Sequence, residues 1–348
     1  MRALVLQDWW SLTVAEQPDP RVGAEDVLVR VLATGICGSD LHGFTGHNGR
    51  RRHGQVMGHE TAGHVVELGA EVGGGLAVGD VVTINPVIGC HSCSRCAAGA
   101  PQLCEDKTVI GVTPRRAAAF AELIVAPAAN LVPLPAGMPD EHGALVEPLA
   151  VGYHAVRRAP VRPGDAVLVI GGGPIGQACV LAARREGAGA VAVSEPDAHR
   201  RSLAASLGAV AVDPATGPLP PAAQRALGER PAVVVDAVGS GATLAAALAS
   251  ARPNGSVVLV GMAEPELAIP AYDVSTEERT IFGSFCYTPA EFRDTARWAG
   301  TAPDDLERLI EGRVDLSGGP DAFVRLARGD WTASKVLVFP NGLSVGAV

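Results

Sequence analysis

The chain has 348 residues and a formal net charge of −9, and 47% of its residues are hydrophobic, 4% aromatic and 19% charged. This length is enough for two domains of ordinary size, or one large one, with a substantial core. The composition excludes an intrinsically disordered chain. The acidic balance without a basic tail argues against a nucleic-acid or anionic-membrane partner.

No segment of the sequence predicts secretion or a membrane span. The apolar start of the chain ends at Asp8, which makes it too short for the core of a signal peptide. The longest charge-free stretch, residues 166–183, contains three glycines and a proline that would break a spanning helix. We therefore expect a soluble cytoplasmic protein.

The first part of the chain is predicted to be rich in β-structure. Short apolar runs are separated there by glycine, proline and aspartate, which is the pattern of strands joined by turns. These runs lie at residues 27–32, 64–68, 81–84 and 122–125.

From residue 163 onwards the pattern changes to strands that alternate with helices. Nearly continuous apolar runs are typical of a parallel sheet covered by helices on both faces. The runs lie at residues 166–170, 190–193, 233–235 and 257–260. Helical patterns lie at residues 177–186, 197–207 and 241–251, and a further helix is predicted near 289–298.

A glycine motif follows the first of these apolar runs and opens a predicted helix. The G-x-G-x-x-G pattern is weak by itself in a chain with 42 glycines, but this strand–turn–helix context is that of a dinucleotide site. Backbone N–H groups at the start of such a helix bind a pyrophosphate. The alternative is a plain glycine-rich turn. The motif residues are Gly171, Gly173, Pro174, Ile175 and Gly176.

Glu195 lies at the end of the second strand of this unit and predicts the choice of cofactor. A carboxylate at that place accepts hydrogen bonds from the adenosine ribose hydroxyls and repels a 2′-phosphate, which favours NAD. Arg200 and Arg201 are close in sequence and could contact the cofactor, and nearby arginines can accommodate that phosphate. The alternative for Glu195 is a surface carboxylate.

Four of the seven cysteines lie close together in the first part of the chain. Disulfide frameworks belong to small secreted domains, which this chain does not resemble. Four thiolates on one loop suit a closed tetrahedral structural zinc site. An iron–sulfur cluster is the chemical alternative, because thiolates bind those clusters too. The cysteines are Cys90, Cys93, Cys96 and Cys104.

Three further segments carry residues that could bind a second metal ion. They are residues 35–42, residues 58–60 and residues 147–150. With these segments, the four-cysteine loop, the glycine motif and residues 280–285, the sequence resembles the zinc-dependent alcohol dehydrogenases of the medium-chain dehydrogenase/reductase family. Within the family it is most similar to the branch of sorbitol (L-iditol) and threonine dehydrogenases, and the match covers nearly the whole chain.

The resemblance implies an α/β protein with two domains. A GroES-like, β-rich catalytic domain spans residues 1–147 and is completed by residues 287–348. A Rossmann domain with a doubly wound parallel sheet spans residues 148–286 and binds NAD. The cleft between them holds a catalytic zinc, which gives two zinc ions per chain, one catalytic and one structural. The segment 280–285 resembles the edge strand that pairs across a homodimer, and relatives are also homotetramers.

The resemblance also implies roles for individual residues. Cys37, His59 and Glu147 match the ligands of the catalytic zinc, and Glu60 matches a neighbouring carboxylate that approaches the metal. Asp40 matches the carboxylate that orients the histidine ligand. Ser39 and His42 match a proton relay, so the implied catalytic residues are Ser39, His42 and Asp40.

The implied reaction is the oxidation of a secondary alcohol, such as a polyol, sugar or cyclitol, to the ketone. Zinc lowers the pKa of the substrate hydroxyl, a hydride passes from the carbon to nicotinamide, and the relay removes the proton. Two alternatives stay open: a zinc-free quinone or enoyl reductase that uses NADPH, and a non-catalytic nucleotide-binding protein with the same fold.

Basic residues in the loop 47–53 and at Arg115 and Arg116 have two interpretations. At the mouth of a cleft they would steer an anionic substrate such as a phosphorylated polyol. Because charge runs are usually solvated, a surface loop is the preferred interpretation, and Arg51 is expected to be exposed with its neighbours.

Overall fold

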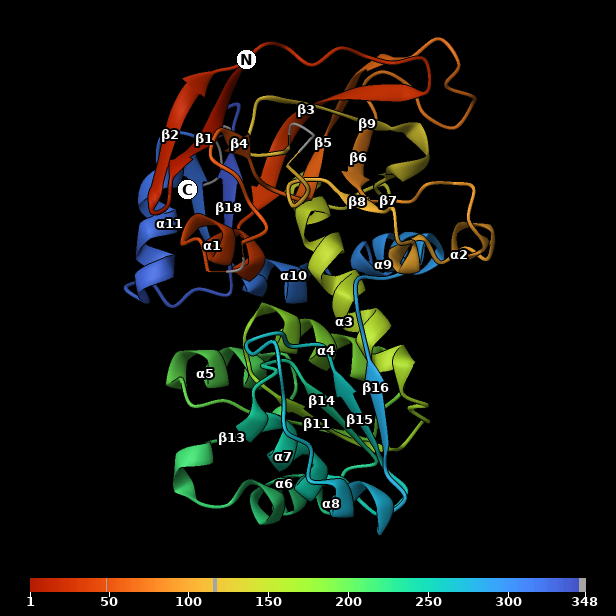
Figure 1. The fold of residues 1–348 in the computed structure, drawn as a ribbon, viewed down its shortest axis with the longest axis vertical. Coiled ribbons are helices and arrows are strands. Elements are labelled where there is room, and N and C mark those ends of the chain that lie inside the picture. Colours follow the sequence, from red (N-terminus) through yellow and green to blue (C-terminus); the bar gives the residue numbers. More distant parts are fainter. Residues whose placement is uncertain (48, 115–117, 344–348) are drawn as a thin grey trace. The chain divides into compact units, whose positions relative to one another are not determined.

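The computed structural model describes residues 1–47, 49–114 and 118–343, and it divides the chain into two compact units. The first unit comprises Met1–Glu147 and Thr288–Val348, and the second comprises Pro148–Tyr287 (Figure 1). Arg115 and Arg116 lie outside the described residues, so their predicted place beside a substrate has no structural counterpart here.

The first unit contains a seven-stranded sheet in the order β10-β6-β5-β3-β18-β17, with β9 also paired to β3. A three-stranded sheet, β2-β1-β4, and a two-stranded sheet, β7-β8, accompany it. The strands are β1 (Arg2–Asp8), β2 (Ser11–Glu16), β3 (Asp26–Gly35), β4 (Gln55–Val56), β5 (Glu60–Leu68), β6 (Val81–Ile84), β7 (Val87–Ile88), β8 (Thr108–Val109), β9 (Leu123–Pro127), β10 (Leu131–Pro133), β17 (Ile310–Asp315) and β18 (Lys335–Phe339).

The helices of this unit are short. They are α1 (Gly38–Phe44), α2 (Ser94–Ala97), α9 (Pro289–Ala299), α10 (Pro303–Leu309) and α11 (Gly319–Arg328), with the 3₁₀ turns η1 (Pro101–Leu103), η2 (Ala128–Asn130) and η3 (Asp140–Leu145). Helix α3 (Val146–Arg158) begins at the end of the unit.

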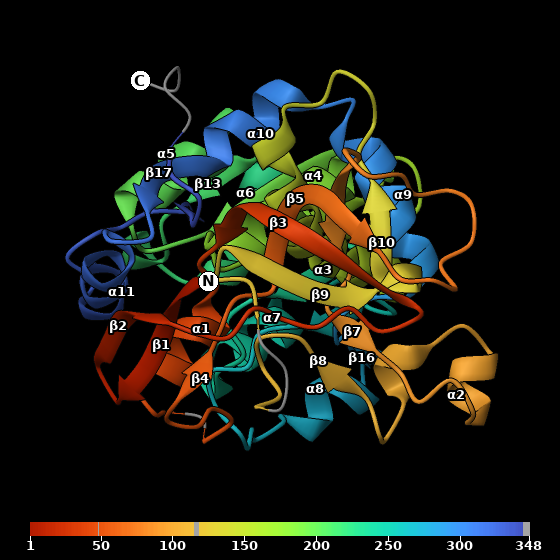
Figure 2. The ribbon, with the colours of Figure 1, turned by 90° about the horizontal axis from the view of Figure 1, so that it is seen from above.

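Strand β3 lies at the centre of this unit because alternate side chains along it are apolar. Val27, Val29 and Val31 are fully buried while Arg30 between them is exposed, as expected for a period of two residues. Three strands pair with β3, namely β5, β9 and β18, and Figure 2 shows β5 and β9 beside it.

The second unit is a six-stranded parallel sheet in the order β13-β12-β11-β14-β15-β16. Strand order reverses between β11 and β14, which is the switch point at which doubly wound sheets bind ligands. The predicted fold class is therefore confirmed. The elements are β11 (Ala166–Ile170), α4 (Pro174–Arg185), β12 (Ala190–Ser194), α5 (Ala198–Ser206), β13 (Val210–Val212), η4 (Pro214–Thr216), α6 (Leu219–Leu227), β14 (Val233–Asp236), α7 (Gly241–Ser250), β15 (Ser256–Leu259), α8 (Ala271–Ser275) and β16 (Thr280–Gly283).

The predicted strands and helices are present, with bounds that differ by a few residues, but the sequence patterns missed several elements. Helix α6 begins Leu219-Pro220-Pro221, and prolines are tolerated in the first turn of a helix, where no intrahelical N–H bond is lost. Helix α11 likewise has a proline in its first turn. Among the described residues, no helix is long and apolar enough to cross a membrane.

Candidate active site and metal centres

Strand pairing in the first unit gathers three potential metal ligands. Strands β3 and β5 are antiparallel, and Gly35 at the end of β3 faces Glu60 at the start of β5. Cys37 follows β3 by two residues and His59 immediately precedes β5, so the pairing sets the two side by side. One ligand atom from each of Cys37, His59 and Glu60 lies within 4.8 Å of the others.

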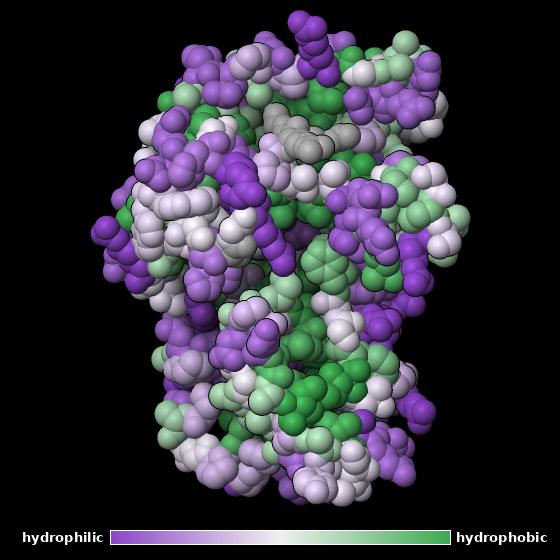
Figure 3. All heavy atoms as spheres, in the orientation of Figure 1, coloured by the Kyte–Doolittle hydropathy of each residue, from purple (hydrophilic) through white to green (hydrophobic). Residues whose placement is uncertain are grey.

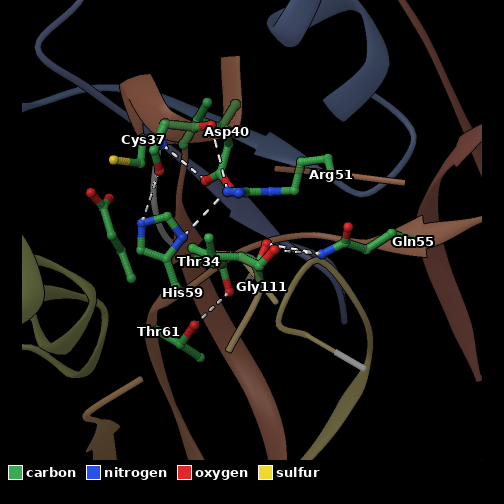
Figure 4. Close-up of polar contacts among 12 residues, drawn as sticks. Thr34, Cys37, Asp40, Arg51, Gln55, His59, Thr61 and Gly111 are labelled. Carbon is green, nitrogen blue, oxygen red and sulfur yellow. Dashed lines mark hydrogen bonds and ion pairs between the residues drawn. The ribbon is translucent and has the colours of Figure 1, made fainter. Parts of the chain in front are cut away.

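Asp40 on α1 lies behind the imidazole of His59 (Figure 4). Its Oδ1 is 3.5 Å from Nδ1 of His59, which is within ion-pair range but long for a hydrogen bond. The other imidazole nitrogen, Nε2, lies 3.5 Å from Oγ of Ser39. Burial lowers the pKa of His59, but the charges of Asp40 and Cys37 outweigh burial and hold this pKa well above its usual value. Asp40 thus lies on the Nδ1 side of the ring, and its role in orienting this ligand remains a prediction.

Glu60 is fully buried and is paired with Lys335 from β18. Nζ of Lys335 lies 2.8 and 2.5 Å from the two carboxylate oxygens, and it also donates to the Ile36 carbonyl at 3.3 Å. Burial lowers the pKa of Lys335, but the charge of Glu60, with smaller contributions from Cys37 and Glu147, raises it above its usual value. The ammonium group therefore competes with a metal ion for the Glu60 carboxylate.

Glu147 is buried, with 6% of its surface exposed, at the start of α3. It is near enough to Lys335 to affect the pKa of that lysine, but it does not belong to the group of three ligand atoms described above. The structure thus places Glu60 closer to Cys37 and His59 than Glu147, and the assignment of Glu147 as a ligand remains a prediction.

The buried charges around this site fit a divalent cation. The carboxyl groups of Asp40, Glu60 and Glu147 are buried, and the thiol of Cys37 is half-buried. Two buried basic groups, Arg51 and Lys335, accompany these four acidic groups. With these six groups ionised and His59 protonated, as its raised pKa favours, the set still carries one excess negative charge, which is costly in a protein interior unless a counter-ion is bound. A zinc ion that took the place of the His59 proton, with thiolate, imidazole and carboxylate ligands, would neutralise the set.

His42, the second predicted relay residue, lines an open cavity of about 650 Å³ in the first unit. Its ring centroid lies 5.5 Å from that of His47, on the same cavity wall. Burial, with a smaller contribution from His47, lowers the pKa of His42, so its neutral form is favoured near neutral pH. A neutral imidazole there can accept a proton.

The four clustered cysteines form a second potential metal site. Their Sγ atoms lie within 4.8 Å of one another, with Cys90 and Cys96 4.0 Å apart, and all four are free thiols. The Ser92 hydroxyl and backbone N–H groups lower the pKa of Cys90 to about 6, while burial raises that of Cys96 to about 11. Four sulfurs in this arrangement fit a closed tetrahedral zinc site.

The glycine motif in the second unit leaves room for a ligand. Gly171 has a φ of 95°, and a Cβ at Gly176 would overlap the Gly171 carbonyl oxygen, so both require glycine for the chain itself. A Cβ at Gly173, by contrast, would lie in open space next to the first turn of α4, and helix N-termini with such space are where phosphate groups bind.

Glu195 immediately follows β12 and is buried beside this loop. Its two carboxylate oxygens accept hydrogen bonds from the backbone N–H groups of Gly172 at 2.7 Å and Asp197 at 2.9 Å. Arg201 is held by Asp213 at 2.9 Å and by the Glu195 carbonyl, and the backbone N–H of Arg200 donates to Asp197. Glu195 therefore has a fixed orientation, and Arg201 is already paired.

Two residues at the metal site were not identified from the sequence. Arg51 was expected to be exposed in a solvated loop, but it is 1% exposed and pairs with Asp40, so that expectation is wrong. Its neighbours Arg50 and Arg52 are exposed, as expected for such a loop. Lys335 is one of only two lysines in the chain and begins a buried strand, which is a signal that could have identified it.

Comparisons with known proteins agree with this geometry. The alcohol dehydrogenase GroES-like domain matches residues 23–136, and the zinc-binding dehydrogenase family matches residues 174–301. The chain is 35% identical to L-idonate 5-dehydrogenase of Vitis vinifera, with 85% of this chain and 80% of the relative covered. It is 36% identical to sorbitol dehydrogenase of Arabidopsis thaliana, with the same coverage.

A solved structure from Sinorhizobium meliloti 1021, described as a zinc-binding dehydrogenase bound to NADP, is similar throughout. It has a TM-score of 0.88 and 32% sequence identity, and 97% of this chain and 99% of that chain are covered. The fold, the two sets of clustered ligands and these relatives lead to one conclusion: the chain belongs to the zinc-dependent alcohol dehydrogenases of the medium-chain dehydrogenase/reductase family.

Proposed function

We propose that this enzyme oxidises a secondary hydroxyl of a polyol or sugar-derived substrate to the ketone, with NAD as hydride acceptor and with two zinc ions per chain. The observation that carries the proposal is the site of Cys37, His59 and Glu60, whose ligand atoms lie within 4.8 Å of one another among buried groups with an excess of negative charge. The substrate class is supported by relatives that are named L-idonate and sorbitol dehydrogenases.

Residues of the first unit have separate roles in the proposed reaction. Cys37, His59 and a carboxylate would hold the zinc, which when bound would supply the Lewis acidity that lowers the pKa of the substrate hydroxyl. Ser39, whose Oγ lies beside His59, would accept the hydroxyl proton, and His42 would release it towards solvent at the end of the relay. Asp40 keeps the imidazole of His59 in orientation, and Lys335 holds Glu60.

The alternative of a zinc-free reductase accounts less well for the site. Such an enzyme has no need of a buried thiol, imidazole and carboxylate within 4.8 Å of one another. The decisive assay is NAD⁺ reduction with a panel of polyols, sugar acids and simple secondary alcohols. Turnover that survives complete removal of zinc, or activity only with quinones or enones and NADPH, would contradict the proposed function.

Replacing Glu195 with alanine should shift the cofactor preference towards NADP⁺. Hydrogen bonds to a charged group contribute about 1.5–3 kcal/mol, so the ratio of kcat/KM for NAD⁺ to that for NADP⁺ should fall by about 10- to 100-fold. The backbone N–H groups of Gly172 and Asp197 lose their acceptor in this variant, which weakens binding of both cofactors. The ratio is therefore the informative quantity.

Glu195→Gln is the matched control, because its amide oxygen keeps an acceptor for one of the two backbone N–H groups, while the NH2 group faces the other and the negative charge is lost. It should shift the ratio in the same direction with a smaller loss of affinity. The NADP found in the Sinorhizobium structure is a property of that protein. A wild-type enzyme that uses NADP⁺ as well as NAD⁺ would refute the assignment.

For the assembly we propose a homodimer, or a tetramer built from such dimers, that pairs through β16. This strand is last in the order of the parallel sheet, and Thr280 and Gly283 at its ends are exposed. Exposed apolar side chains follow or precede it, among them Phe285 and Tyr272, and Figure 3 shows apolar surface over part of this unit. Unpaired strand edges favour such pairing. A solution mass equal to one chain would contradict it.

A further inference from the structure

Arg51 is built into the interior beside the proposed catalytic zinc site. Its guanidinium is fully buried, and Nη2 lies 3.2 Å from Oδ1 of Asp40. The aliphatic part of the side chain passes close to Gly43 of α1, where a Cβ would overlap Cγ of Arg51. Helix α1 therefore accommodates this arginine through a glycine.

Fold stability does not explain why an arginine occupies this position. Among the residues that the structure describes, Nε and Nη1 of Arg51 have no hydrogen-bond partner, so the ion pair with Asp40 is the main compensation for burying the charge. Buried ion pairs with incomplete hydrogen bonding are often no more stable than apolar residues of similar volume. Burying the Arg51–Asp40 pair therefore lowers the stability of the fold, and a functional role would explain why the pair is present.

Asp40, the partner of Arg51, contacts two of the predicted ligands, His59 and Cys37. Its Oδ1 faces Arg51 on one side and Nδ1 of His59 at 3.5 Å on the other, as Figure 4 shows. Its Oδ2 accepts a hydrogen bond from the backbone N–H of Cys37 at 3.3 Å. The orientation of the Asp40 carboxylate thus determines the positions of the His59 imidazole and of the Cys37 backbone.

We propose that Arg51 is a positioning residue of the metal centre, which holds the Asp40 carboxylate in the orientation that fixes His59 and Cys37 together. A guanidinium is always charged and directs its donors rigidly, so it keeps the carboxylate ionised and prevents its rotation. The proposal rests on the proposed function, because it requires zinc at Cys37 and His59. Carboxylates that orient histidine ligands are common at metal sites. Here Arg51 would in turn orient the Asp40 carboxylate.

The test measures zinc affinity by competition with a chelator, together with thermal unfolding. The variants are Arg51→Met, Asp40→Asn, the double variant, and Arg52→Met as an exposed control at the next residue of the same loop. Loss of groups that orient metal ligands typically weakens metal binding about 10- to 100-fold. We expect the zinc affinity of the site at Cys37 and His59 to fall by that factor in Arg51→Met and in Asp40→Asn. The double variant should show the same loss and no more, and Arg52→Met should show none.

The four-cysteine zinc serves as the internal reference and should stay bound in all variants. Arg51→Met leaves the buried Asp40 carboxylate without its arginine and should lower the unfolding temperature, whereas the double variant removes that charge and should recover most of the stability without recovering zinc affinity. A purely structural role predicts that both recover together. Arg51→Lys, which keeps the charge without the planar fork, should bind zinc with intermediate affinity.

Wild-type zinc affinity in the double variant, or losses that multiply instead of coinciding, would overturn the proposal. If Arg51→Met does not fold, the double variant decides the question. A wild-type enzyme that holds zinc only at the four cysteines would refute the proposed function itself, and this outcome is recognised before any variant is made.

Discussion

Replacing Glu147 with alanine should lower turnover by at least about 100-fold while the fold and NAD⁺ affinity stay near those of the wild type. A zinc ion contributes several kcal/mol of charge stabilisation in the transition state, and each 1.36 kcal/mol corresponds to tenfold in rate. Glu147→Cys should restore a competent ligand set with an altered rate, because thiolate is a good zinc ligand.

Glu60 complicates this outcome, because its carboxylate lies within 4.8 Å of Cys37 and His59 while Lys335 holds it. It could replace a lost Glu147 once it leaves the ammonium group. Zinc content and turnover should therefore be measured for Glu147→Ala, Glu60→Ala and the double variant. Full catalytic zinc with near-normal turnover in Glu147→Ala, and loss only in Glu60→Ala, would transfer the ligand role to Glu60.

Changing Cys93 to serine should damage stability far more than chemistry. Binding of structural zinc contributes directly to folding free energy, so loss of one thiolate should lower the unfolding temperature by about 10 °C. Cys93 is also the N-cap residue of α2, where its Sγ accepts from the N–H of Cys96. The turnover of folded enzyme at low temperature should stay close to wild type.

Cys179→Ser is a matched control for this change, because Cys179 is a fully buried thiol outside the cluster. It should leave the zinc content unchanged. An absorbance band in the visible range, with iron in place of zinc, would show the iron–sulfur alternative instead. Equal stability of Cys93→Ser and wild type would contradict a structural zinc.

The four central strands of the parallel-sheet unit were predictable because they are buried on both faces and form continuous apolar runs. Ala166–Ile170 is buried at every position, and the sequence predicts β11 with the same bounds. Helix α6 was missed because adjacent prolines normally indicate a loop. They occupy its first turn, where the backbone N–H groups need no intrahelical partner.

The candidate ligands were predictable from motifs, whereas the groups that hold them were not. Glu60 and Lys335 are separated by 275 positions, and only the pairing of β18 with β3 brings the lysine to the site. In the sequence Arg51 lies between two arginines, both exposed, and such a run of charged residues normally indicates an exposed loop. Its burial depends on space beside Gly43, which is a property of tertiary packing and leaves no periodic signal.

The most direct test of the account is the zinc content of the purified enzyme before and after mild chelation, with NAD⁺-dependent polyol oxidation measured on the same samples. The account predicts two zinc ions per chain. Chelation should remove one zinc ion and abolish the activity, and rebinding of that zinc should restore the activity. The zinc held by the four cysteines should stay bound throughout. Active enzyme with one tightly held zinc or none would contradict the account.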